Sequence, residues 1–340
     1  MDSNIDAAVL GAGSWGTALA ILLANNGHRV KLWARREAQA KEMADTRINE
    51  RYLPGFELPE NLRPTSDLKE ALEGAQLVLS VVPTHGLRSV LETAADLLPP
   101  DAPVLSCTKG IEQGTLKMIS GVFEEHLPAD RHHLMTYLAG PSFAREVAAN
   151  MPTAVTVAGS DDDVAHRVQH WLRNPYFRVY TTEDVVGAEV GGALKNIIAI
   201  AAGMGDGLGF GHNARAAVIT RGLAEIGRLG AKLGAHPMTV YGLAGMGDLV
   251  LTCNGDLSRN RKVGLALGRG QKIGEILESM NMVAEGVKTT KSAYQLAQRE
   301  GVDMPTTSMM YRILYEDLDP KEAVVELMGR PPRKERDDHA

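Results

Sequence analysis

The stretch Gly11-Ala12-Gly13-Ser14-Trp15-Gly16 stands between a short apolar run, residues 7–10, and a longer apolar stretch, residues 17–24. The first run predicts a strand and the second a helix. In such a unit Gly11 permits the tight turn, Gly13 lets the backbone approach a pyrophosphate, and Gly16 lets helix and strand pack closely. The amides and the dipole at the start of the helix favour the phosphates. The motif therefore predicts a dinucleotide site, with a purely structural glycine turn as the alternative.

Length and composition favour a globular protein of two domains. The chain has 340 residues, 44% of them apolar, which is enough for substantial cores. A net charge of -6 gives no indication of an electrostatic nucleic-acid partner. The two cysteines, Cys107 and Cys253, lie far apart. We therefore expect neither a disulfide framework nor a zinc ribbon, and a reducing compartment suits the chain.

The N-terminal residues and the apolar segments predict a cytoplasmic protein. The first six residues are acidic and lack the basic and apolar regions of a signal peptide. The longest strongly apolar helical run, residues 197–204, is too short to span a bilayer. We expect no stable membrane insertion.

Apolar runs alternate with helical patterns in the first half of the chain. The helical patterns include residues 67–73 and 164–172, and Asp67 and Asp184 are expected helix N-caps. This alternation predicts an α/β fold with a mainly parallel, doubly wound Rossmann-type sheet over residues 1–183. The expected strands are residues 7–10, 30–33, 77–82, 104–107, 135–139, 154–158 and 177–180.

From Asp184 onward the strand patterns nearly vanish, and Ala, Leu, Gly and Met dominate. We predict an all-α C-terminal domain over residues 184–330, which would hold the substrate, after the NAD(P)-binding domain of residues 1–183. Residues 331–340 are dense in charge and are expected to form a mobile tail. The expected helices of the second domain are residues 187–204, 214–233, 274–280, 289–299 and 307–314.

The residues after the second expected strand indicate the type of cofactor. An NAD-preferring fold usually places an acidic residue there to bind the ribose 2′-hydroxyl. This chain has Arg35 and Arg36 instead. A guanidinium can bind a 2′-phosphate with two hydrogen bonds. The pair favours NADP(H) over NAD(H), with a solvated surface pair as the alternative.

In an open α/β sheet, ligands bind beyond the carboxyl ends of the strands. Lys109 follows one such strand and suits an anionic substrate or a cofactor phosphate. Gly140 and Ser142 follow another strand and offer a backbone amide and a hydroxyl. His85 follows a third, and we assign it a structural role.

Lys195 and Asn196 begin a nearly continuous apolar helical stretch. Burying an ammonium is costly, so a lysine in such surroundings can exchange a proton near neutral pH. The alternative is a lysine whose stem extends to the surface. We predict that Lys195 is the catalytic proton carrier.

Two further segments of the second half carry polar groups suited to a phosphorylated substrate. Asp248 stands in a glycine-rich apolar stretch, where it would orient a lysine, accept a hydrogen bond from substrate, or cap a helix. Ser258, Arg259 and Asn260 begin a helix, and together with its N-terminal amides they suit a phosphate. An N-cap with a basic face is the structural alternative there.

No His, Cys or carboxylate cluster has the spacing of a metal site, so we expect no metal. The neighbours His132 and His133 would not face one ligand on a regular element. The glycine-rich residues 207–211 follow no strand and are expected to end a helix.

Taken in order, these segments resemble the bacterial NAD(P)-dependent glycerol-3-phosphate dehydrogenases. The resemblance extends from residue 11 to about residue 290 and covers nearly the whole chain. The long segment around Lys195 is its most specific part. The matching segments are GAGSWGTALA, NERYLPG, CTKGIE, AGPSFAREVA, GGALKNIIAIAAGMGDGLGFGHNARAAVITRGLAE, AGMGDLVLTC, LSRNRKVG, VAEGVKTT and GRPPRKE.

The resemblance implies reversible reduction of dihydroxyacetone phosphate to sn-glycerol 3-phosphate, at the entry to glycerophospholipid synthesis. It implies that Lys195 is the proton acceptor for the glycerol hydroxyl, and that the protein is a homodimer. The substrate-contacting positions of the family correspond to Lys109, Gly140, Ser142, Lys195, Asp248, Ser258, Arg259 and Asn260. Its cofactor positions correspond to Ser14, Trp15, Arg35, Tyr52, Lys109, Ala144, Arg259, Val283 and Glu285, beside Gly11, Gly13, Gly16 and Arg36 of the motifs above.

Without the resemblance, the residues predict a dinucleotide-dependent oxidoreductase for a small anionic substrate, with one site between the two domains. One alternative is a related two-domain dehydrogenase of the 3-hydroxyacid or ketopantoate type, whose substrate has a carboxylate in place of the phosphate. Another is a non-catalytic redox sensor that binds NADP(H). Lys195 argues against the sensor, which needs no proton donor.

Overall fold

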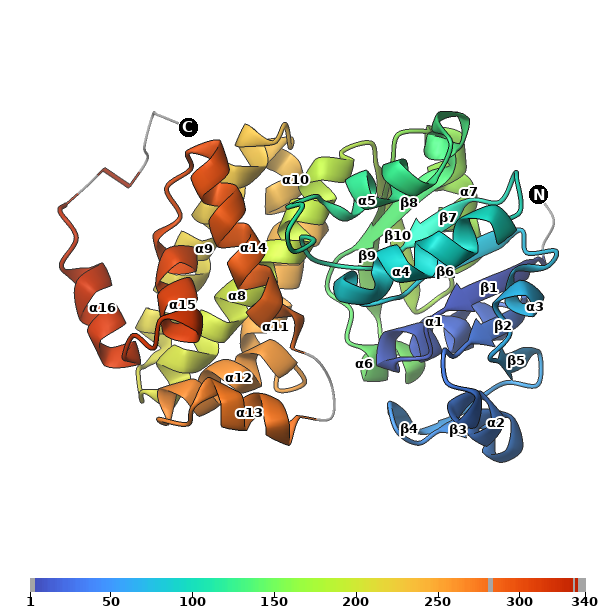
Figure 1. Cartoon of the computed structure of the whole chain (residues 1–340), viewed down its shortest axis with the longest axis horizontal. Helices are drawn as coiled ribbons and strands as arrows, with labels where there is room; N and C mark the ends of the chain where they lie inside the picture. The colour runs from blue at the N-terminus through green and yellow to red at the C-terminus, as the bar shows by residue number, and fades with distance from the viewer. Residues whose placement is uncertain (1–3, 281–283, 333, 336–340) are drawn as a thin grey trace. The chain divides into compact units, whose positions relative to one another are not determined.

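The computed structural model describes residues 4–280, 284–332 and 334–335 (Figure 1). The chain divides into two compact units. Unit 1 comprises Met1–Lys109 and Ile119–Val185, and unit 2 comprises Gly110–Met118 and Val186–Ala340. The short segment Gly110–Met118 thus belongs with the helical part of the chain, although it lies within the first half of the sequence. An isolated antiparallel bridge between Ile111 and Met118 closes this segment into a loop.

Unit 1 contains an eight-stranded sheet in the order β10-β9-β8-β7-β6-β1-β2-β5. Neighbouring strands are parallel except for the β8–β9 pair, which is antiparallel. The predicted mainly parallel, doubly wound sheet is therefore confirmed. The strands are β1 (Asp6–Leu10), β2 (Arg29–Trp33), β5 (Leu62–Thr65), β6 (Leu77–Ser80), β7 (Val104–Ser106), β8 (Met135–Ala139), β9 (Thr153–Gly159) and β10 (Phe177–Thr182).

Helices cover both faces of this sheet (Figure 1). The first helix, α1 (Ser14–Asn25), contacts α6 (Ala144–Ala148) and α7 (Asp162–Leu172), while α4 (Thr84–Ala94) contacts α5 (Ile119–His126). Leu19 and Leu23 of α1 are fully buried in the core beside Val9 of β1. The remaining elements are α2 (Glu37–Thr46), α3 (Leu68–Leu72) and the hairpin of β3 (Ile48–Asn49) with β4 (Leu53–Glu57).

The strand order places a topological switch point beside the glycine turn. The chain runs from β1 outward to β2 and β5, and then returns to β6 on the other side of β1. Connections leave in opposite directions at the carboxyl ends of β1 and β6, and such a crevice is where open α/β sheets bind ligands. Gly11 follows β1 directly and so stands at this crevice.

His28 joins the beginning of β1 to the end of α7. Its Nε2 lies 2.9 Å from the carbonyl oxygen of Trp171, and its Nδ1 accepts from the amide of Ile5 at 3.4 Å. Both contacts are made by one neutral tautomer, with the hydrogen on Nε2. Burial lowers the pKa of His28 from its ordinary value of 6.5, against the raising effect of the Trp171 carbonyl.

We therefore expect His28 to make the protein less stable in mild acid. A depressed pKa in the folded state stabilises the fold above the unfolded pKa, and this contribution is lost as the pH falls. Between about pH 7.5 and 5.5, the unfolding free energy of the wild type should fall more than that of His28→Gln. Urea unfolding at several pH values measures this, with the exposed His133→Gln as the matched control. Equal pH dependence in wild type and His28→Gln would contradict the assignment.

Unit 2 is built around α8 (Val185–Gly207), in which every residue from Gly187 to Met204 is buried. The prediction that this apolar segment is too short for a bilayer is wrong, because α8 has 23 residues and passes that test by length and composition. Its most apolar window is 83% buried within the protein. Since neighbouring helices of unit 2 cover it, α8 is a core helix.

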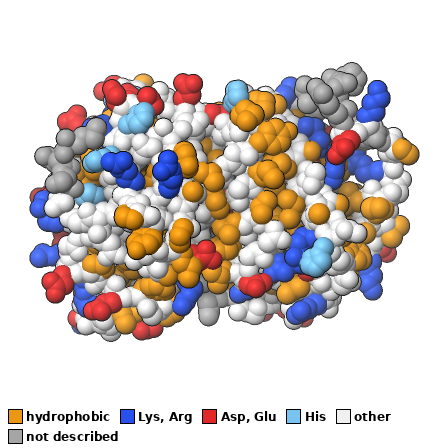
Figure 2. Space-filling view, turned by 180° about the vertical axis from the view of Figure 1, so that it is seen from behind, with side chains coloured by type: hydrophobic (Ala, Val, Ile, Leu, Met, Phe, Trp, Pro, Cys, Tyr) orange, Lys and Arg blue, Asp and Glu red, His pale blue; other side chains and the backbone are white. Residues whose placement is uncertain are grey.

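The other helices of unit 2 contribute residues to one hydrophobic core with α8, and the last of them in the chain contacts α15 (Figure 1). They confirm the predicted helical C-terminal region. They are α9 (His212–Lys232), α10 (Pro237–Tyr241), α11 (Asp248–Asn254), α12 (Arg259–Gly268), α13 (Ile273–Ser279), α14 (Glu285–Glu300), α15 (Pro305–Tyr315) and α16 (Pro320–Met328), with a π-helical turn at Leu243–Gly247. On the face that Figure 2 displays, acidic and basic side chains are interspersed among apolar ones.

Candidate active site

The glycine turn after β1 has the geometry expected of a dinucleotide fingerprint. Gly11 has a φ of 116°, and its amide donates to the carbonyl oxygen of Trp33 at 3.0 Å. A Cβ on Gly11 would lie 2.6 Å from the carbonyl oxygen of Val81. A Cβ on Gly16 would lie 1.8 Å from the carbonyl oxygen of Gly11. The first and third glycines therefore have no room for a side chain.

The middle glycine faces open space. A Cβ on Gly13 would meet no atom within 4 Å, and α1 begins at the next residue without a side-chain cap. The carbonyl of Ala12 is held by two donors, Gln39 Nε2 at 2.7 Å and Asn49 Nδ2 at 3.0 Å. A fixed turn, an open glycine and the amides of a twelve-residue helix together form a place for an anionic group.

Hydrogen bonds connect the residues after β2 to this turn. Arg36 donates to the Gln39 side chain at 3.2 Å and to the Tyr52 hydroxyl at 3.4 Å. Ser14 Oγ donates to the Tyr52 carbonyl at 2.6 Å. Arg35 is exposed beside Arg36, and Trp15 is half-buried. The structure thus brings Ser14, Arg36 and Tyr52 together.

The predicted residues after β7 and β8 lie at the same end of the sheet, because both strands run parallel to β6 and β1. The Lys109 carbonyl accepts from the Thr84 hydroxyl at 2.9 Å. Gly140, with a φ of 124°, follows β8, and Ser142 Oγ donates to its carbonyl at 3.1 Å. Ala144 begins α6. His85 lies in the first turn of α4.

In unit 2, Lys195 and Asp248 form a buried ion pair. Lys195 Nζ donates to Asp248 Oδ1, and the two residues are 8% and 1% exposed. The Thr252 hydroxyl donates to the Asp248 carbonyl at 2.6 Å. Because an isolated buried charge is very costly, each charge of the pair makes burial of the other tolerable. Of the interpretations open for Asp248, the pair agrees with the orientation of a lysine; the N-cap of α11 is Gly247.

Glycines allow this pair to form. A Cβ on Gly191 of α8 would lie 2.6 Å from the carbonyl oxygen of Ala244, so the π-helical turn rests directly on α8. Asp248 begins α11 immediately after that turn, and it faces Lys195 one helical turn beyond Gly191. A larger residue at Gly191 would push the carboxylate away from the lysine.

The beginning of α12 lies against the same part of α8. Asn260 Nδ2 donates to Asn196 Oδ1 at 2.9 Å, and Asn260 Oδ1 accepts from the Gly286 amide at 3.0 Å. Ser258 Oγ accepts from the Arg261 amide at 3.2 Å, as an N-cap does. Asn196, next to Lys195, therefore ties α8 to α12, and Asn260 ties α12 to α14.

The two arginines at the beginning of α12, Arg259 and Arg261, have different charged neighbours. Arg261 makes ion pairs with Asp206 at 2.8 Å and Asp256 at 2.9 Å, which marks it as structural. Burial lowers the pKa of the Arg259 guanidinium, and the negative charge of Glu285 opposes that shift. Val283, another predicted cofactor contact, lies outside the described residues.

Neither cysteine has the surroundings of a nucleophile. Cys107 and Cys253 are buried and unpaired with each other. Burial raises the pKa of Cys253 to about 12 and raises that of Cys107 further. Both thiols stay protonated near neutral pH.

Among the predicted site residues, hydrogen bonds join Ser14, Tyr52 and Arg36 in unit 1 and Lys195 with Asp248 in unit 2, and Asn260 is joined to Asn196 beside that pair. No role was predicted from the sequence for Gln39, Asn49, Asn196 or Thr252. Of these four, only Asn196 could have been noticed in the sequence, because it is a polar residue next to a lysine on an apolar helix. Within residues 4–280, 284–332 and 334–335, no group of three or more His, Cys, Asp and Glu is arranged to hold a metal.

Comparison with known proteins identifies one family. Residues 6–165 match the N-terminal region of NAD-dependent glycerol-3-phosphate dehydrogenases, and residues 184–325 match the C-terminal region. A protein of Citrifermentans bemidjiense called glycerol-3-phosphate dehydrogenase [NAD(P)+] is 56% identical over 95% of this chain and 96% of its own. One of that name from Geobacillus thermodenitrificans is 51% identical over 97% and 96%.

Solved structures agree. The crystal structure of glycerol-3-phosphate dehydrogenase from Coxiella burnetii is 42% identical, with a TM-score of 0.92 over 97% of this chain and 100% of that one. A ketopantoate reductase from Ralstonia eutropha has a TM-score of 0.58 over 94% of this chain and all of its own. At 15% identity, this second likeness concerns the fold alone.

Proposed function

Because this chain belongs to the NAD-dependent glycerol-3-phosphate dehydrogenase family, we propose that it reduces dihydroxyacetone phosphate reversibly to sn-glycerol 3-phosphate. The observation that carries the proposal is the buried Lys195–Asp248 pair on the central helix of unit 2. A redox sensor would have no use for a buried proton donor. The hydroxyacid alternative is supported only by a likeness of fold.

In this proposal Lys195 moves the proton. The nicotinamide, when bound, supplies the hydride that adds to the carbonyl carbon. The Lys195 ammonium donates a proton to the carbonyl oxygen, which becomes the C2 hydroxyl. In the reverse direction the neutral amine accepts that proton. Asp248 holds Nζ in place, and its negative charge stabilises the ammonium before each reduction.

The beginning of α12 is the proposed phosphate site. The Arg259 guanidinium supplies positive charge there, and α12, with ten residues, adds the amides of its first turn. Asn196 and Gly286 hold the Asn260 side chain at this place. Ser258, Lys109, Gly140 and Ser142 complete the proposed substrate contacts, by their correspondence to the family positions.

The glycine turn of unit 1 is the proposed pyrophosphate site. Its open middle glycine and its clamped Ala12 carbonyl support this assignment. Arg35 and Arg36 are proposed to hold the 2′-phosphate of NADP(H). The further proposed cofactor contacts are Ser14, Trp15, Tyr52, Lys109, Ala144, Arg259, Val283 and Glu285.

The arginine pair gives a test of cofactor preference. Arg35→Ser with Arg36→Ser should raise KM for NADPH by roughly tenfold or more, because charge-assisted hydrogen bonds to the 2′-phosphate are lost. KM for NADH should change little. Initial rates with each cofactor measure both values, and Arg63→Ser, at another exposed arginine, is the matched control. Equal changes for the two cofactors would remove the arginines from this role.

We also propose how the protein works in its cell. Residues 1–183 would form the NAD(P)-binding domain and residues 184–330 the substrate and catalytic domain, and each domain would also contribute contacts to the ligand of the other. The enzyme would act as a cytoplasmic homodimer that supplies the backbone of glycerophospholipids. Sedimentation of the purified chain tests the dimer. The reaction is tested by the loss of NADPH absorbance when dihydroxyacetone phosphate is added. A parallel assay with ketopantoate tests the alternative substrate.

A further inference from the structure

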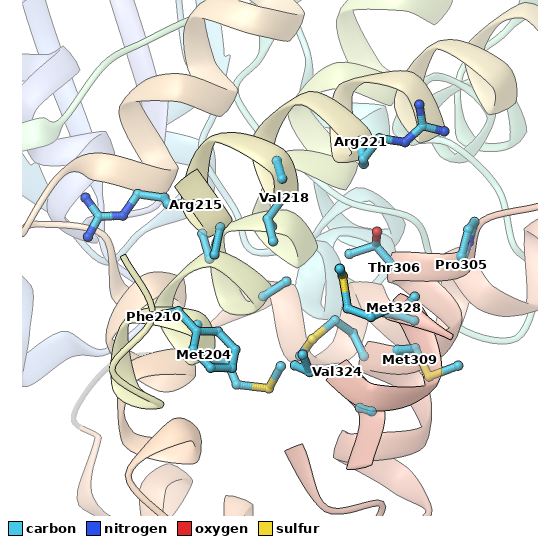
Figure 3. A pocket seen from close by; sticks show the side chains of 18 of the residues that line it. Met204, Phe210, Arg215, Val218, Arg221, Pro305, Thr306, Met309, Val324 and Met328 are labelled. Carbon is cyan, nitrogen blue, oxygen red and sulfur yellow. The ribbon is translucent and has the colours of Figure 1, made fainter. Parts of the chain in front are cut away.

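Unit 2 holds a cavity that the proposed reaction does not use. It has a volume of about 540 Å³ and lies between the last turns of α8, the length of α9, the first turns of α15, and α16 (Figure 3). None of the residues proposed for catalysis lines it. Cavities of roughly 300–1,000 Å³ are typical of small-molecule sites.

The middle of this cavity is apolar. Figure 3 shows Met204, Val218, Val324, Met309 and Met328 around it. Methionine side chains are flexible and polarisable, so they adapt to an apolar guest of variable shape. Such a lining suits a hydrocarbon and gives little hydrogen bonding to a sugar or a base.

Positive charge prevails among the ionisable residues that line the cavity. The basic ones are Arg215, Arg221, Arg228, Arg330 and Lys334, and the acidic ones are Asp206, Glu225 and Glu335. Two of the three carboxylates are already engaged. Asp206 pairs with Arg215 and Arg261, and Glu225 accepts from the amides of Thr306 and Thr307 at 2.6 and 3.0 Å. Among the basic residues, Arg330 pairs with Asp303 at 3.0 Å, and Arg228 donates to the neutral carbonyl of Asp303 at 3.0 Å. With the paired residues set aside, basic lining residues still outnumber acidic ones, so an anion is favoured at the rim over a cation.

Arg221 is the residue best placed to bind that anion. Arg221 lines the cavity from α9, and in Figure 3 its exposed side chain extends outward from the apolar middle, on the opposite side from Arg215. Arg215 is held by Asp206 at 2.6 Å, whereas Arg221 makes no hydrogen bond or ion pair within the described part of the chain. A guanidinium without a partner can form a bidentate contact with a carboxylate.

We propose that this cavity binds a single-chain anionic amphiphile of the fatty-acid type. The hydrocarbon lies among the methionines of α8, α15 and α16, and the carboxylate lies at the rim with Arg221. The hydrocarbon chain of the ligand suits the apolar middle of the cavity, and its carboxylate suits the basic rim. A neutral hydrocarbon would leave the arginines unused, and a cationic amphiphile would be repelled by them.

Calorimetric titration of the full chain with alkyl carboxylates, each below its micelle concentration, tests the proposal. From octanoate to dodecanoate, Kd should fall roughly three- to fourfold for each added methylene, as expected for burial of hydrocarbon. Arg221→Glu should weaken dodecanoate binding by about tenfold or more. Dodecyltrimethylammonium should bind far more weakly than dodecanoate to the wild type.

A matched pair of variants locates the site. Ala217 and Ala216 are both exposed on α9, but only Ala217 lines the cavity. Ala217→Trp should abolish dodecanoate binding, and Ala216→Trp should bind it as the wild type does. Equal binding by the two variants would overturn the proposal.

Two further results would also overturn it. One is equal affinity for the carboxylate and for dodecyltrimethylammonium. The other is no binding by the wild type together with dissociation of a dimer by Ala217→Trp, which would identify the cavity as an interface between two copies of this chain. Reduction of dihydroxyacetone phosphate is measured separately, so failure here leaves the proposed enzyme activity unaffected.

Discussion

Replacing Lys195 by methionine should lower kcat by about 10²–10⁴-fold, the range associated with loss of a general acid. Methionine keeps most of the apolar stem but has no proton to give. KM should change much less than kcat, because the phosphate contacts proposed for Arg259 and Asn260 remain. Initial rates of NADPH oxidation with dihydroxyacetone phosphate separate the two parameters.

The stability of this variant has to be controlled, because Asp248 would be left buried without its partner charge. The double variant Lys195→Met with Asp248→Asn removes both charges together. It should unfold at nearly the wild-type urea concentration and still be inactive. Lys232→Met, at an exposed lysine of α9, should keep wild-type kcat. A folded double variant with wild-type turnover would show that Lys195 is not the proton donor.

Gly264→Ala should reduce the unfolding free energy by about 3 kcal/mol or more, the upper part of the range for overpacked sites. A Cβ at this position of α12 would lie 1.9 Å from the carbonyl oxygen of Ile200 on α8. The clash involves backbone on both sides, so no side-chain rotation relieves it. The helices would have to separate, and the Asn196–Asn260 hydrogen bond between them should weaken.

Gly274→Ala is the matched control. Gly274 lies in α13 with no atom within 4 Å of an added Cβ, so alanine there should stabilise the helix by roughly 0.5–1 kcal/mol. Urea unfolding of the two variants gives the comparison. If Gly264→Ala were as stable as Gly274→Ala, α8 and α12 would not approach each other as the structure has them.

Seven of the eight strands of the sheet could be predicted from the sequence, including the edge strand β10, whereas the strand at the other edge, β5, could not. The predicted run at residues 135–139 agrees with β8 (Met135–Ala139). The prediction missed β5, which contains Pro64, and proline weakens a strand signal. This strand is at the edge of the sheet, where a missing amide hydrogen is tolerated. The strand β4 was missed for a similar reason, because it contains Pro54 and Gly55.

In unit 2, glycines made helices hard to recognise. The π-helical turn contains Gly245 and Gly247 and follows Gly242, and α11 begins directly after it. The apolar residues of this stretch show no clear helical periodicity. Glycines also allow close contact between this turn and α8: a Cβ on Gly191 of α8 would lie 2.6 Å from the Ala244 carbonyl oxygen and 2.9 Å from the Cα of Gly245. Local propensity cannot reveal such contacts, because they depend on which helix lies opposite.

Individual candidate residues could be predicted from the sequence, but the contacts between them could not. An apolar helix with one lysine pointed to Lys195, but its partner Asp248 is 53 positions away, and no periodicity connects the two. Likewise, Ser14, Arg36 and Tyr52 are joined by hydrogen bonds that only the folded loop after β2 creates. Chemistry-bearing residue types are visible in a sequence, whereas their distances are a property of the fold.

The central claim is that Lys195, held by Asp248, supplies the proton for reduction of dihydroxyacetone phosphate. Single-turnover oxidation of NADPH by the wild type and by the Lys195→Met, Asp248→Asn double variant tests it most directly. The wild type should oxidise bound NADPH on addition of dihydroxyacetone phosphate. The folded double variant should do so at least about 10²-fold more slowly. Equal rates, or no oxidation by folded wild type, would contradict the claim.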